Sequence, residues 1–149
     1  DVVIATGLAG GRAAISLERV AVNLIDARIP DADGAQPVDV PSLVGGTSAA
    51  FSSLPVKAIV AAIDAAGIPV ELSLSAGPYV CNHVFMHAAA WADARASRAG
   101  FIHLPWGVGQ APAGEPELPI EQMAEALAIA IRVALDAPDD LHTPSGPIA

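Results

Sequence analysis

The sequence predicts an α/β fold, a three-layer α/β/α sandwich with helices on both faces of a mostly parallel mixed sheet. Two observations support this prediction. Segments with the patterning of strands alternate along the chain with segments that have helical periodicity. In addition, 53% of the 149 residues are hydrophobic and only 15% are charged, which is enough to bury one core. We therefore expect a single domain over residues 1–149, with its active site at the carboxyl ends of strands.

The first third of the chain reads as strand and loop. The opening "DVVIATG" is a short apolar run that breaks into the Gly-rich "GLAGGR", which is typical of a buried strand followed by a loop. Residues 13–23, "AAISLERVAVN", favour a strand because they are rich in β-branched side chains, although a short helix stays possible. Residues 26–52 contain Pro, Gly and Asp throughout, so we expect a long surface loop of the kind that often covers a site.

The rest of the chain alternates between helix and strand. The helix at 52–67 can be capped by Ser52 or Ser53 and can end at Gly67. The remaining predicted elements are a strand at 68–77, a helix at 79–97, a strand at 100–106, a loop at 109–119, a helix at 119–136 and a loose tail at 137–149.

The charge balance restricts the partners. Seven Lys and Arg residues against 16 Asp and Glu give a formal net charge of −9. Nucleic acids and anionic membranes attract clustered cations, so we expect neither as a partner. A small molecule or a neutral peptide suits this composition better.

The single cysteine, Cys81, excludes an intramolecular disulfide and a cysteine-based metal cluster. A free thiol fits a reducing compartment, and we expect the protein to be cytoplasmic. No run of 18 uncharged apolar residues occurs, so no membrane span is predicted. The start at Asp1 has no basic region of a signal peptide and enters a buried strand at once, so we expect further sequence before it.

Cys81 lies in "SAGPYVCNHVF", between a predicted strand and a predicted helix. Gly77 and Pro78 predict a sharp turn, which places the cysteine near the start of the helix. Backbone N–H groups and the positive end of the helix dipole favour a thiolate there. This arrangement is typical of a thiol nucleophile on a strand-to-helix turn. The alternative is a small residue buried among apolar neighbours.

Four histidines could assist such a thiol. His83 and His87 have the i, i+4 spacing of zinc ligands, but "HVFMH" lacks the glutamate of a zincin motif, and we expect neither a metal nor another cofactor. His142 lies in the predicted tail. His103 ends the strand that follows the Cys81 helix, so it returns to the same edge of the sheet, as a Cys–His pair requires. Its alternative is a structural histidine beside the "LPW" turn.

An orienting carboxylate would complete a triad, and two glutamates lie inside patterned segments. Glu18 sits between apolar positions, where an unpaired carboxylate is costly, so it is either functional or paired with Arg19 or Arg28. Glu71 opens the strand that leads to Cys81, which puts it at the wrong end for the site.

The Gly-rich "GLAGGR" invites comparison with phosphate-binding loops. It matches neither GxGxxG nor GxxxxGK[ST], and no lysine follows it, so nucleotide binding is weakly supported. We expect its glycines to allow close approach of the backbone to another group.

Three segments together, "GLAGGRAAISLERVAVNLIDARIPDADG", "SLSAGPYVCNHVFMHAAAW" and "AGFIHLPW", resemble the pyroglutamyl-peptidase I family, also called pyrrolidone-carboxylate peptidases. The resemblance covers roughly residues 1–110. It implies an α/β/α sandwich and a cytosolic cysteine peptidase that removes N-terminal pyroglutamyl residues from peptides. It also implies a triad of Cys81 as nucleophile, His103 as base and Glu18 as orienting carboxylate.

The resemblance further implies that Leu8, Arg28 and Val80 contact the substrate and that the protein is a homo-oligomer, a dimer or tetramer. Two departures stand out. The family's front section, with its first strand, aromatic loop, helix and second strand, does not precede Asp1 here, and Leu8 stands where many members carry Gln. The alternative function is therefore a non-catalytic binding or assembly relative of the same fold. A phosphorylase-like enzyme is a third option, but the chain lacks basic residues suited to phosphate.

Overall fold

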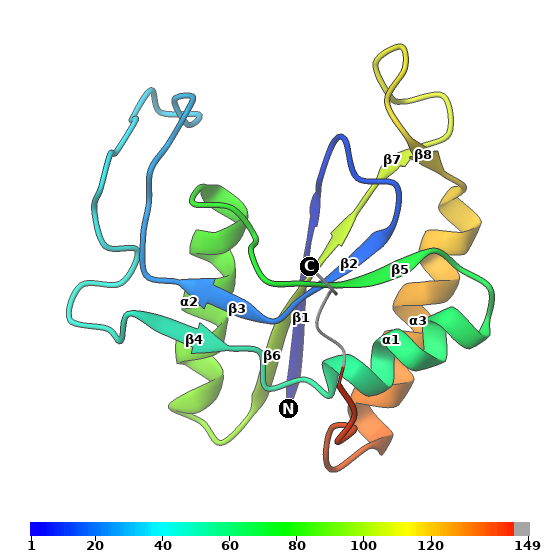
Figure 1. Ribbon diagram of the computed structural model, residues 1–149. Helices are drawn as coiled ribbons and strands as arrows, with labels where there is room; N and C mark the ends of the chain where they lie inside the picture. Colours follow the sequence, from blue (N-terminus) through cyan, green and yellow to red (C-terminus); the bar gives the residue numbers. More distant parts are fainter. Residues whose placement is uncertain (145–149) are drawn as a thin grey trace.

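The structure, a computed structural model, describes residues 1–144 and contains a central sheet with helices on both faces (Figure 1). The elements in chain order are β1 Val2–Leu8, β2 Ile15–Glu18, β3 Val20–Val22, β4 Ala49–Phe51, α1 Val56–Ala65, β5 Val70–Ser73, α2 Val80–Asp93, β6 Arg98–Leu104, β7 Trp106–Gly107, β8 Glu117–Leu118 and α3 Ile120–Asp136. No helix within residues 1–144 is long and apolar enough to cross a membrane.

The central sheet has the order β1-β6-β2-β5. β1 runs parallel to β6 and β2 runs parallel to β5, whereas β2 and β6 are antiparallel. Helices α1 and α3 pack together on one face, and α2 packs on β1 and β6 from the other face (Figure 1). The predicted three-layer sandwich with a mixed sheet is therefore confirmed.

Alternation along β2 explains why this short strand is entirely buried. Ile15 and Leu17 join the larger hydrophobic cluster, together with Ile59 and Ile63 of α1. Ser16 and Glu18 point to the opposite face, because successive side chains of a strand alternate. Burying each large apolar side chain stabilises the fold by about 1.5–3 kcal/mol, and this offsets the cost of placing polar groups on the other face.

The segment 13–23 forms strands, as predicted, but it is divided between two sheets. The change occurs at Arg19, whose N–H donates to the carbonyl of Ser73 while its own carbonyl accepts from the N–H of Ser52. Residues after Arg19 therefore pair with β4 instead of β5. β4 lies inside the predicted loop 26–52, so the prediction of an uninterrupted loop is wrong there.

Helix α1 confirms the predicted stop at Gly67, which has a φ of +74°, but not the predicted start. Neither Ser52 nor Ser53 caps it, because the N-cap position falls on Pro55, which has no side-chain hydrogen bond. The carboxylate of Asp140 accepts the N–H groups of Lys57 and Ala58 at 2.9 and 3.0 Å. A residue from the distant tail thus satisfies N–H groups that the helix leaves free.

Residues 137–144 of the predicted tail have no regular secondary structure, but several hydrogen bonds join them to the rest of the fold. Besides the cap from Asp140, Arg98 donates to the carbonyl of Ala137 at 2.8 Å, and Lys57 donates to the carbonyl of Thr143 at 2.6 Å. The remainder of the predicted tail, 145–149, lies outside the described residues.

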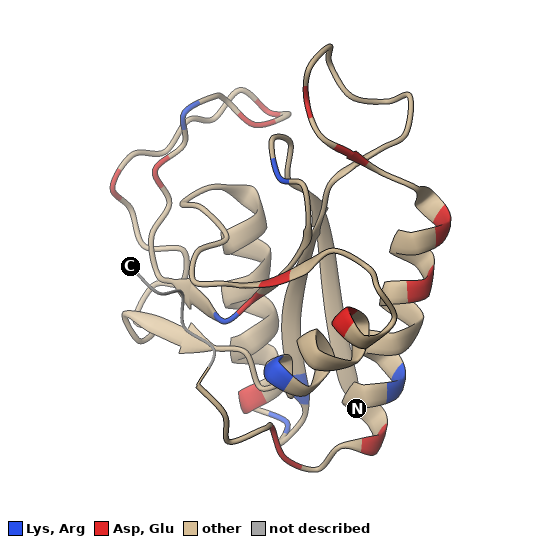
Figure 2. Cartoon of the chain, turned by 45° about the vertical axis from the view of Figure 1, so that its right-hand side comes forward, with Lys and Arg blue, Asp and Glu red and all other residues tan. Residues whose placement is uncertain are grey.

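Charge is unevenly distributed over the surface (Figure 2). Acidic side chains lie along α3 and on the loops 26–40 and 109–117, while the few basic side chains are scattered. The acidic surplus predicted from composition is therefore spread over several elements of the fold.

Candidate active site

The ends of β1, β6 and β2 and the start of α2 lie close together at the sheet (Figure 1). In the strand register, His103 of β6 lies between Gly7 of β1 and Ser16 of β2, and Glu18 lies opposite Phe101. Paired residues on neighbouring strands point to the same face, so His103 and Glu18 both face α2.

His103 and Glu18 form a buried ion pair. Nδ1 of His103 lies 2.7 Å from Oε1 of Glu18, and the two residues are 4% and 0% exposed. Because a carboxylate only accepts, Nδ1 is the donor, and Nε2 is the ring atom left for proton exchange. The ring of Phe101 packs against the histidine with centroids 4.8 Å apart, which limits rotation of the imidazole.

Cys81 is the second residue of α2 and is half-buried. A β-carbon placed on Gly7 would lie 2.9 Å from its Sγ, closer than a real contact allows. The absence of a side chain at Gly7 therefore lets the sulfur reach the end of β1, at the level of His103. This confirms the expectation that a glycine of "GLAGGR" allows close approach.

The pKa of His103 is raised to about 8. Burial of the ring lowers this pKa, but hydrogen bonding to Cys81 and Glu18 and their negative charge outweigh it. At neutral pH the ring is thus mostly protonated.

The pKa of Glu18 is lowered, although burial acts in the opposite direction. Hydrogen bonds from His103 and Arg12, the nearby hydroxyl of Ser73 and the charge of Arg12 favour the carboxylate. Its second oxygen, Oε2, is buried and accepts no hydrogen bond within residues 1–144. The hydroxyl of Ser73, which lies opposite Glu18 in the strand register, donates instead to the carbonyl of Ser75 at 3.3 Å.

Arg12 is the cationic partner of Glu18, at 2.7 Å from Oε1. The sequence predicted Arg19 or Arg28 as a partner for a structural ion pair, and both assignments are wrong. Arg12 reaches Glu18 because the chain turns sharply after β1: the N–H of Arg12 donates to the carbonyl of Ala9, and Gly11 has a φ of +83°. The glycines before Arg12 were the signal in the sequence for this turn.

The first turn of α2 supplies free backbone donors beside the sulfur. Its N-cap residue, Tyr79, makes no side-chain hydrogen bond, and the first helical hydrogen bond runs from the N–H of His83 to the carbonyl of Tyr79. The N–H groups of Val80, Cys81 and Asn82 have no partner inside the helix. An uncapped helix start next to a thiol suits stabilisation of an oxyanion.

The three predicted substrate contacts lie in different surroundings. Leu8 follows Gly7 and is 48% exposed, and Val80 precedes Cys81 and is 52% exposed. Leu8 points to the opposite face of the sheet from Gly7, because successive side chains of a strand alternate, and Val80 lines a cavity beside the start of α2. Arg28 lies exposed on the loop 26–40, and within residues 1–144 no hydrogen bond joins it to Cys81, His103 or Glu18.

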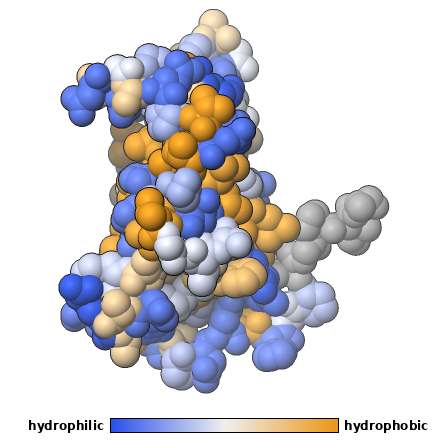
Figure 3. Space-filling view, turned by 90° about the vertical axis from the view of Figure 1, so that its left-hand side faces the viewer, coloured by the Kyte–Doolittle hydropathy of each residue, from blue (hydrophilic) through white to orange (hydrophobic). Residues whose placement is uncertain are grey.

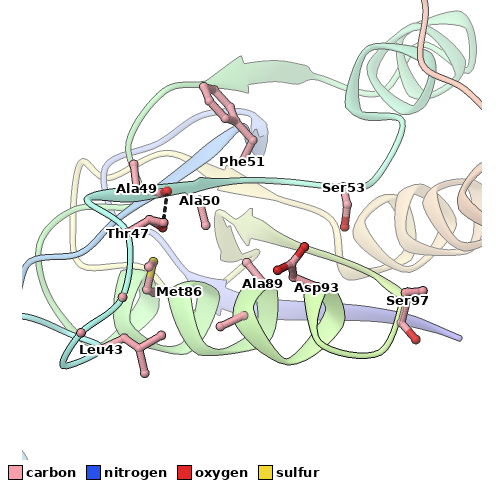
Figure 4. Close-up of a pocket in the computed structure, with 14 residues that line it drawn as sticks. Leu43, Thr47, Ala49, Ala50, Phe51, Ser53, Met86, Ala89, Asp93 and Ser97 are labelled. Carbon is pink, nitrogen blue, oxygen red and sulfur yellow. Dashed lines mark hydrogen bonds between the residues drawn. The ribbon is translucent and has the colours of Figure 1, made fainter.

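A cavity of about 130 Å³ opens beside the same helix start. Most of its walls are apolar or aromatic, and they are formed by Ile25, Asp31, Pro37, Tyr79, Val80 and His83. A larger cavity of about 570 Å³ lies between β4 and the later turns of α2, away from Cys81 (Figure 4). Small residues dominate its lining, and it holds one carboxylate, Asp93.

The route of the chain to Cys81 differs from the prediction. β5 runs antiparallel to β6, so its carboxyl end, Ser73, lies opposite Glu18 and not at the level of the end of β6, and the segment 74–79 crosses back to α2 (Figure 1). Glu71 is consequently level with His103, not at the wrong end. It still lies apart from the histidine, because β2 intervenes and Glu71 accepts a hydrogen bond from Ser16 at 2.7 Å.

His83 and His87 fasten the loop 23–48 to α2. Nδ1 of His83 lies 2.9 Å from the hydroxyl of Ser42, and Nε2 of His87 lies 3.0 Å from the carbonyl of Ser42. The buried side chain of Asn82 holds the start of the same loop through the backbone of Val22 and Leu24. Within residues 1–144, no group of three or more His, Cys, Asp or Glu side chains could hold a metal ion.

Comparison with known proteins identifies the same family along nearly the whole chain. A family model described as pyroglutamyl peptidase matches residues 1–137. The pyrrolidone-carboxylate peptidase of Erwinia tasmaniensis is 47% identical over 148 residues, covering 98% of this chain and 70% of that protein. That of Klebsiella pneumoniae is 53% identical over 136 residues, covering 89% of this chain and 64% of that protein.

Solved structures give the same result for the fold. The pyroglutamyl peptidase I of Bacillus amyloliquefaciens has a TM-score of 0.93 at 41% identity, over 97% of this chain and 70% of that one. The pyrrolidone carboxyl peptidase of Thermococcus litoralis has a TM-score of 0.92 at 36% identity, over 96% of this chain and 71% of that one.

Proposed function

The chain belongs to the pyroglutamyl peptidase family, cysteine peptidases that remove N-terminal pyroglutamyl residues, and we propose that Cys81, His103 and Glu18 carry out this reaction. Cys81 is the nucleophile and His103 exchanges protons. Glu18 orients the histidine and stabilises its protonated form. The observation that carries the proposal is the buried 2.7 Å contact between Glu18 and His103 beside the only thiol of the chain.

In the first half of the reaction, Cys81 attacks as the thiolate. A bond forms between Sγ and the carbonyl carbon that links the pyroglutamyl ring to the next residue, and the carbonyl oxygen becomes an oxyanion. The free N–H groups at the start of α2 stabilise that oxygen. The C–N bond then breaks, and the proton on Nε2 of His103 passes to the leaving amine.

In the second half, water hydrolyses the thioester. Neutral His103 accepts a proton from the water molecule, the hydroxide adds to the thioester carbon, and the C–S bond breaks to release pyroglutamate. Cys81 leaves as the thiolate and His103 is again protonated. Glu18 keeps Nδ1 protonated throughout, so the ring always presents Nε2 to the reacting groups.

Peptides that begin with pyroglutamate are the proposed substrates. Such peptides have no free α-amine, so they need no anionic subsite, and a small neutral pocket suits the lactam ring. Val80 supports this assignment because its side chain lines the mostly apolar cavity beside the start of α2. For Leu8 and Arg28 the support is the family resemblance.

Single-domain organisation, a cytoplasmic location and self-association are further parts of the proposal. The acidic net charge supports a partner other than nucleic acid or a membrane surface. Self-association is supported by apolar side chains that gather over the face formed by α2 and the loop 23–48 (Figure 3). The exposed large apolar residues of these elements and of β4 are Ile29, Val38, Val40, Val44, Phe51, Val80, Val84 and Trp91.

The test is release of a fluorescent amine from a pyroglutamyl amide. We expect wild type to release it and Cys81→Ser and His103→Gln to lose at least about a hundredfold in kcat, because the nucleophile or its proton carrier is gone. Ser42→Ala, which alters the loop contact of His83, is the matched control and keeps activity. Wild type that binds a pyroglutamyl peptide without cleaving it would favour the non-catalytic alternative.

A further inference from the structure

Arg12 makes two hydrogen bonds that have no role in the reaction described above. One nitrogen of its guanidinium donates to Oε1 of Glu18 at 2.7 Å, and the other donates to the carbonyl of Ser75 at 3.0 Å. Ser75 is 63 residues away in sequence and belongs to the segment 74–79 that leads to Cys81. The side chain of Arg12 is 28% exposed, so most of it is enclosed by these partners.

The two donors of Glu18 converge on the same oxygen. Oε1 accepts from Arg12 and from His103, both at 2.7 Å, while Oε2 accepts nothing within residues 1–144. A carboxylate held by one histidine alone can rotate about its bond to the chain and draw the ring with it. The planar fork of an arginine removes that freedom, because its two parallel N–H groups must meet two fixed acceptors.

We propose that Arg12 is a positioning residue that fixes the Glu18 carboxylate toward His103 and ties it to the segment that leads to Cys81. This inference rests on the proposed function. Arg12 touches none of the reacting groups and acts through Glu18 and the backbone of Ser75. The Gly-rich "GLAGGR", which resembles no phosphate loop, thereby has two uses: Gly7 admits the sulfur, and the turn at Gly11 returns Arg12 over the end of β2.

The charge of Arg12 acts in the same direction as its geometry. It helps to lower the pKa of Glu18, which keeps the carboxylate ionised inside a buried site. Lysine at this position would keep the positive charge but could not donate to Oε1 and to the Ser75 carbonyl in one plane. Substitutions of Arg12 can therefore separate the effect of its positive charge from the effect of its planar pair of donors.

Alkylation of Cys81 by iodoacetamide tests the proposal without using peptidase activity. The chain has one cysteine, so the rate reports on Cys81 alone. We expect Arg12→Gln to slow alkylation at pH 7 by about fivefold or more and Arg12→Lys to give an intermediate rate, because the histidine is no longer held beside the thiol. Arg95→Gln is the matched control, since Arg95 stacks on Trp91 at the far end of α2, and it should match wild type.

The second test measures turnover of the pyroglutamyl amide. Arg12→Gln and Arg12→Ala should lower kcat by about tenfold or more with KM changed less than about threefold, and added guanidinium should restore part of the activity of Arg12→Ala. A structural defect would not respond to guanidinium. Equal alkylation rates and kcat in wild type and a folded Arg12→Gln would overturn the proposal, as would a loss that guanidinium does not rescue while alkylation stays unchanged.

Two outcomes separate this inference from the function on which it rests. If wild type cleaves no pyroglutamyl substrate, the proposed function fails, and the alkylation arm still decides the role of Arg12. If Arg12→Gln does not fold, as judged by thermal unfolding, the alkylation rate and kcat of Arg12→Lys are used instead. A rate equal to wild type in both arms then rejects the positioning role.

Discussion

Glu18 and His103 lie on neighbouring antiparallel strands, and Oε1 of Glu18 is 2.7 Å from Nδ1 of His103. This relationship exists because β2 and β6 present alternate residues to the α2 face while their other residues fill the larger core. The contact raises the pKa of His103 and lowers that of Glu18, so it both charges and orients the ring. The following predictions depend on it.

Glu18→Gln should lower the pKa of His103, because the substitution removes a negative charge that stabilises the imidazolium. We expect kcat to fall by about a hundredfold or more, since the ring also loses its orienting acceptor. NMR titration of the His103 ring measures the first effect. Glu71→Gln is the matched control, as Glu71 faces the same side of the sheet but contacts Ser16. An unchanged His103 pKa in Glu18→Gln would contradict the assignment.

Gly7→Ala should displace the nucleophile. The added β-carbon would lie 2.9 Å from Sγ of Cys81 and 2.9 Å from the ring of Phe101, so one of them must move. We expect kcat to fall by about tenfold to a hundredfold, with the fold retained. The measurement is kcat together with the rate of Cys81 alkylation, and Thr6→Ala in the same strand is the control. Wild-type values for Gly7→Ala would show that the sulfur does not rest against β1.

Stability should fall as the pH rises through the range in which His103 loses its proton. The pKa is 6.5 for an ordinary histidine and about 8 in the fold, so the folded state binds the extra proton more tightly. The contribution is fully present below about pH 6.5 and is lost as the pH rises through about 8, and it amounts to roughly 2 kcal/mol.

Urea unfolding at pH 6 and pH 9 measures this contribution as the difference between wild type and His103→Gln. The His103→Gln variant should lack that part of the pH dependence. The same pH dependence in both proteins would mean that other groups cause it.

Asp140→Asn should destabilise the fold by about 1 kcal/mol without changing the chemistry, because it weakens acceptance of the Lys57 and Ala58 N–H groups at the start of α1. Thermal unfolding measures the loss, and Asp139→Asn is the neighbouring control. A change in kcat with unchanged stability would contradict a purely structural role for Asp140.

Patterns local in the sequence were enough to predict most of the fold. The apolar residues Val56, Ile59 and Ile63 and the stop at Gly67 were enough to predict a helix here and its end, since both depend on residues within a few turns. β4 was missed because "AAF" is a three-residue strand whose existence depends on pairing with β3, whose residues lie 27 to 31 positions earlier along the chain. The direction of β5 could not be predicted for a similar reason, as it follows from which strand becomes its neighbour.

For the site, the sequence led to Cys81 and His103 because they lie near a helix start and a strand end, and to Glu18 because a carboxylate between apolar positions must be paired or functional. Their roles stay a prediction until activity is measured. The cationic partner of Glu18, Arg12, could not be predicted from the sequence. Arg19 is next to it in sequence but lies where the chain changes sheets, whereas Arg12 reaches it by a glycine turn. Asp140 capping α1 from the tail is a second such contact.

The most direct test of the account is to trap the acyl-enzyme. Wild type is mixed with a pyroglutamyl amide, quenched in acid within one turnover, digested and examined by mass spectrometry, with Cys81→Ala and Glu71→Gln alongside. The account predicts one pyroglutamyl group attached to Cys81 in wild type and Glu71→Gln, with no adduct and no product from Cys81→Ala. Product formation by Cys81→Ala at the wild-type rate, or an adduct on another residue, would contradict it.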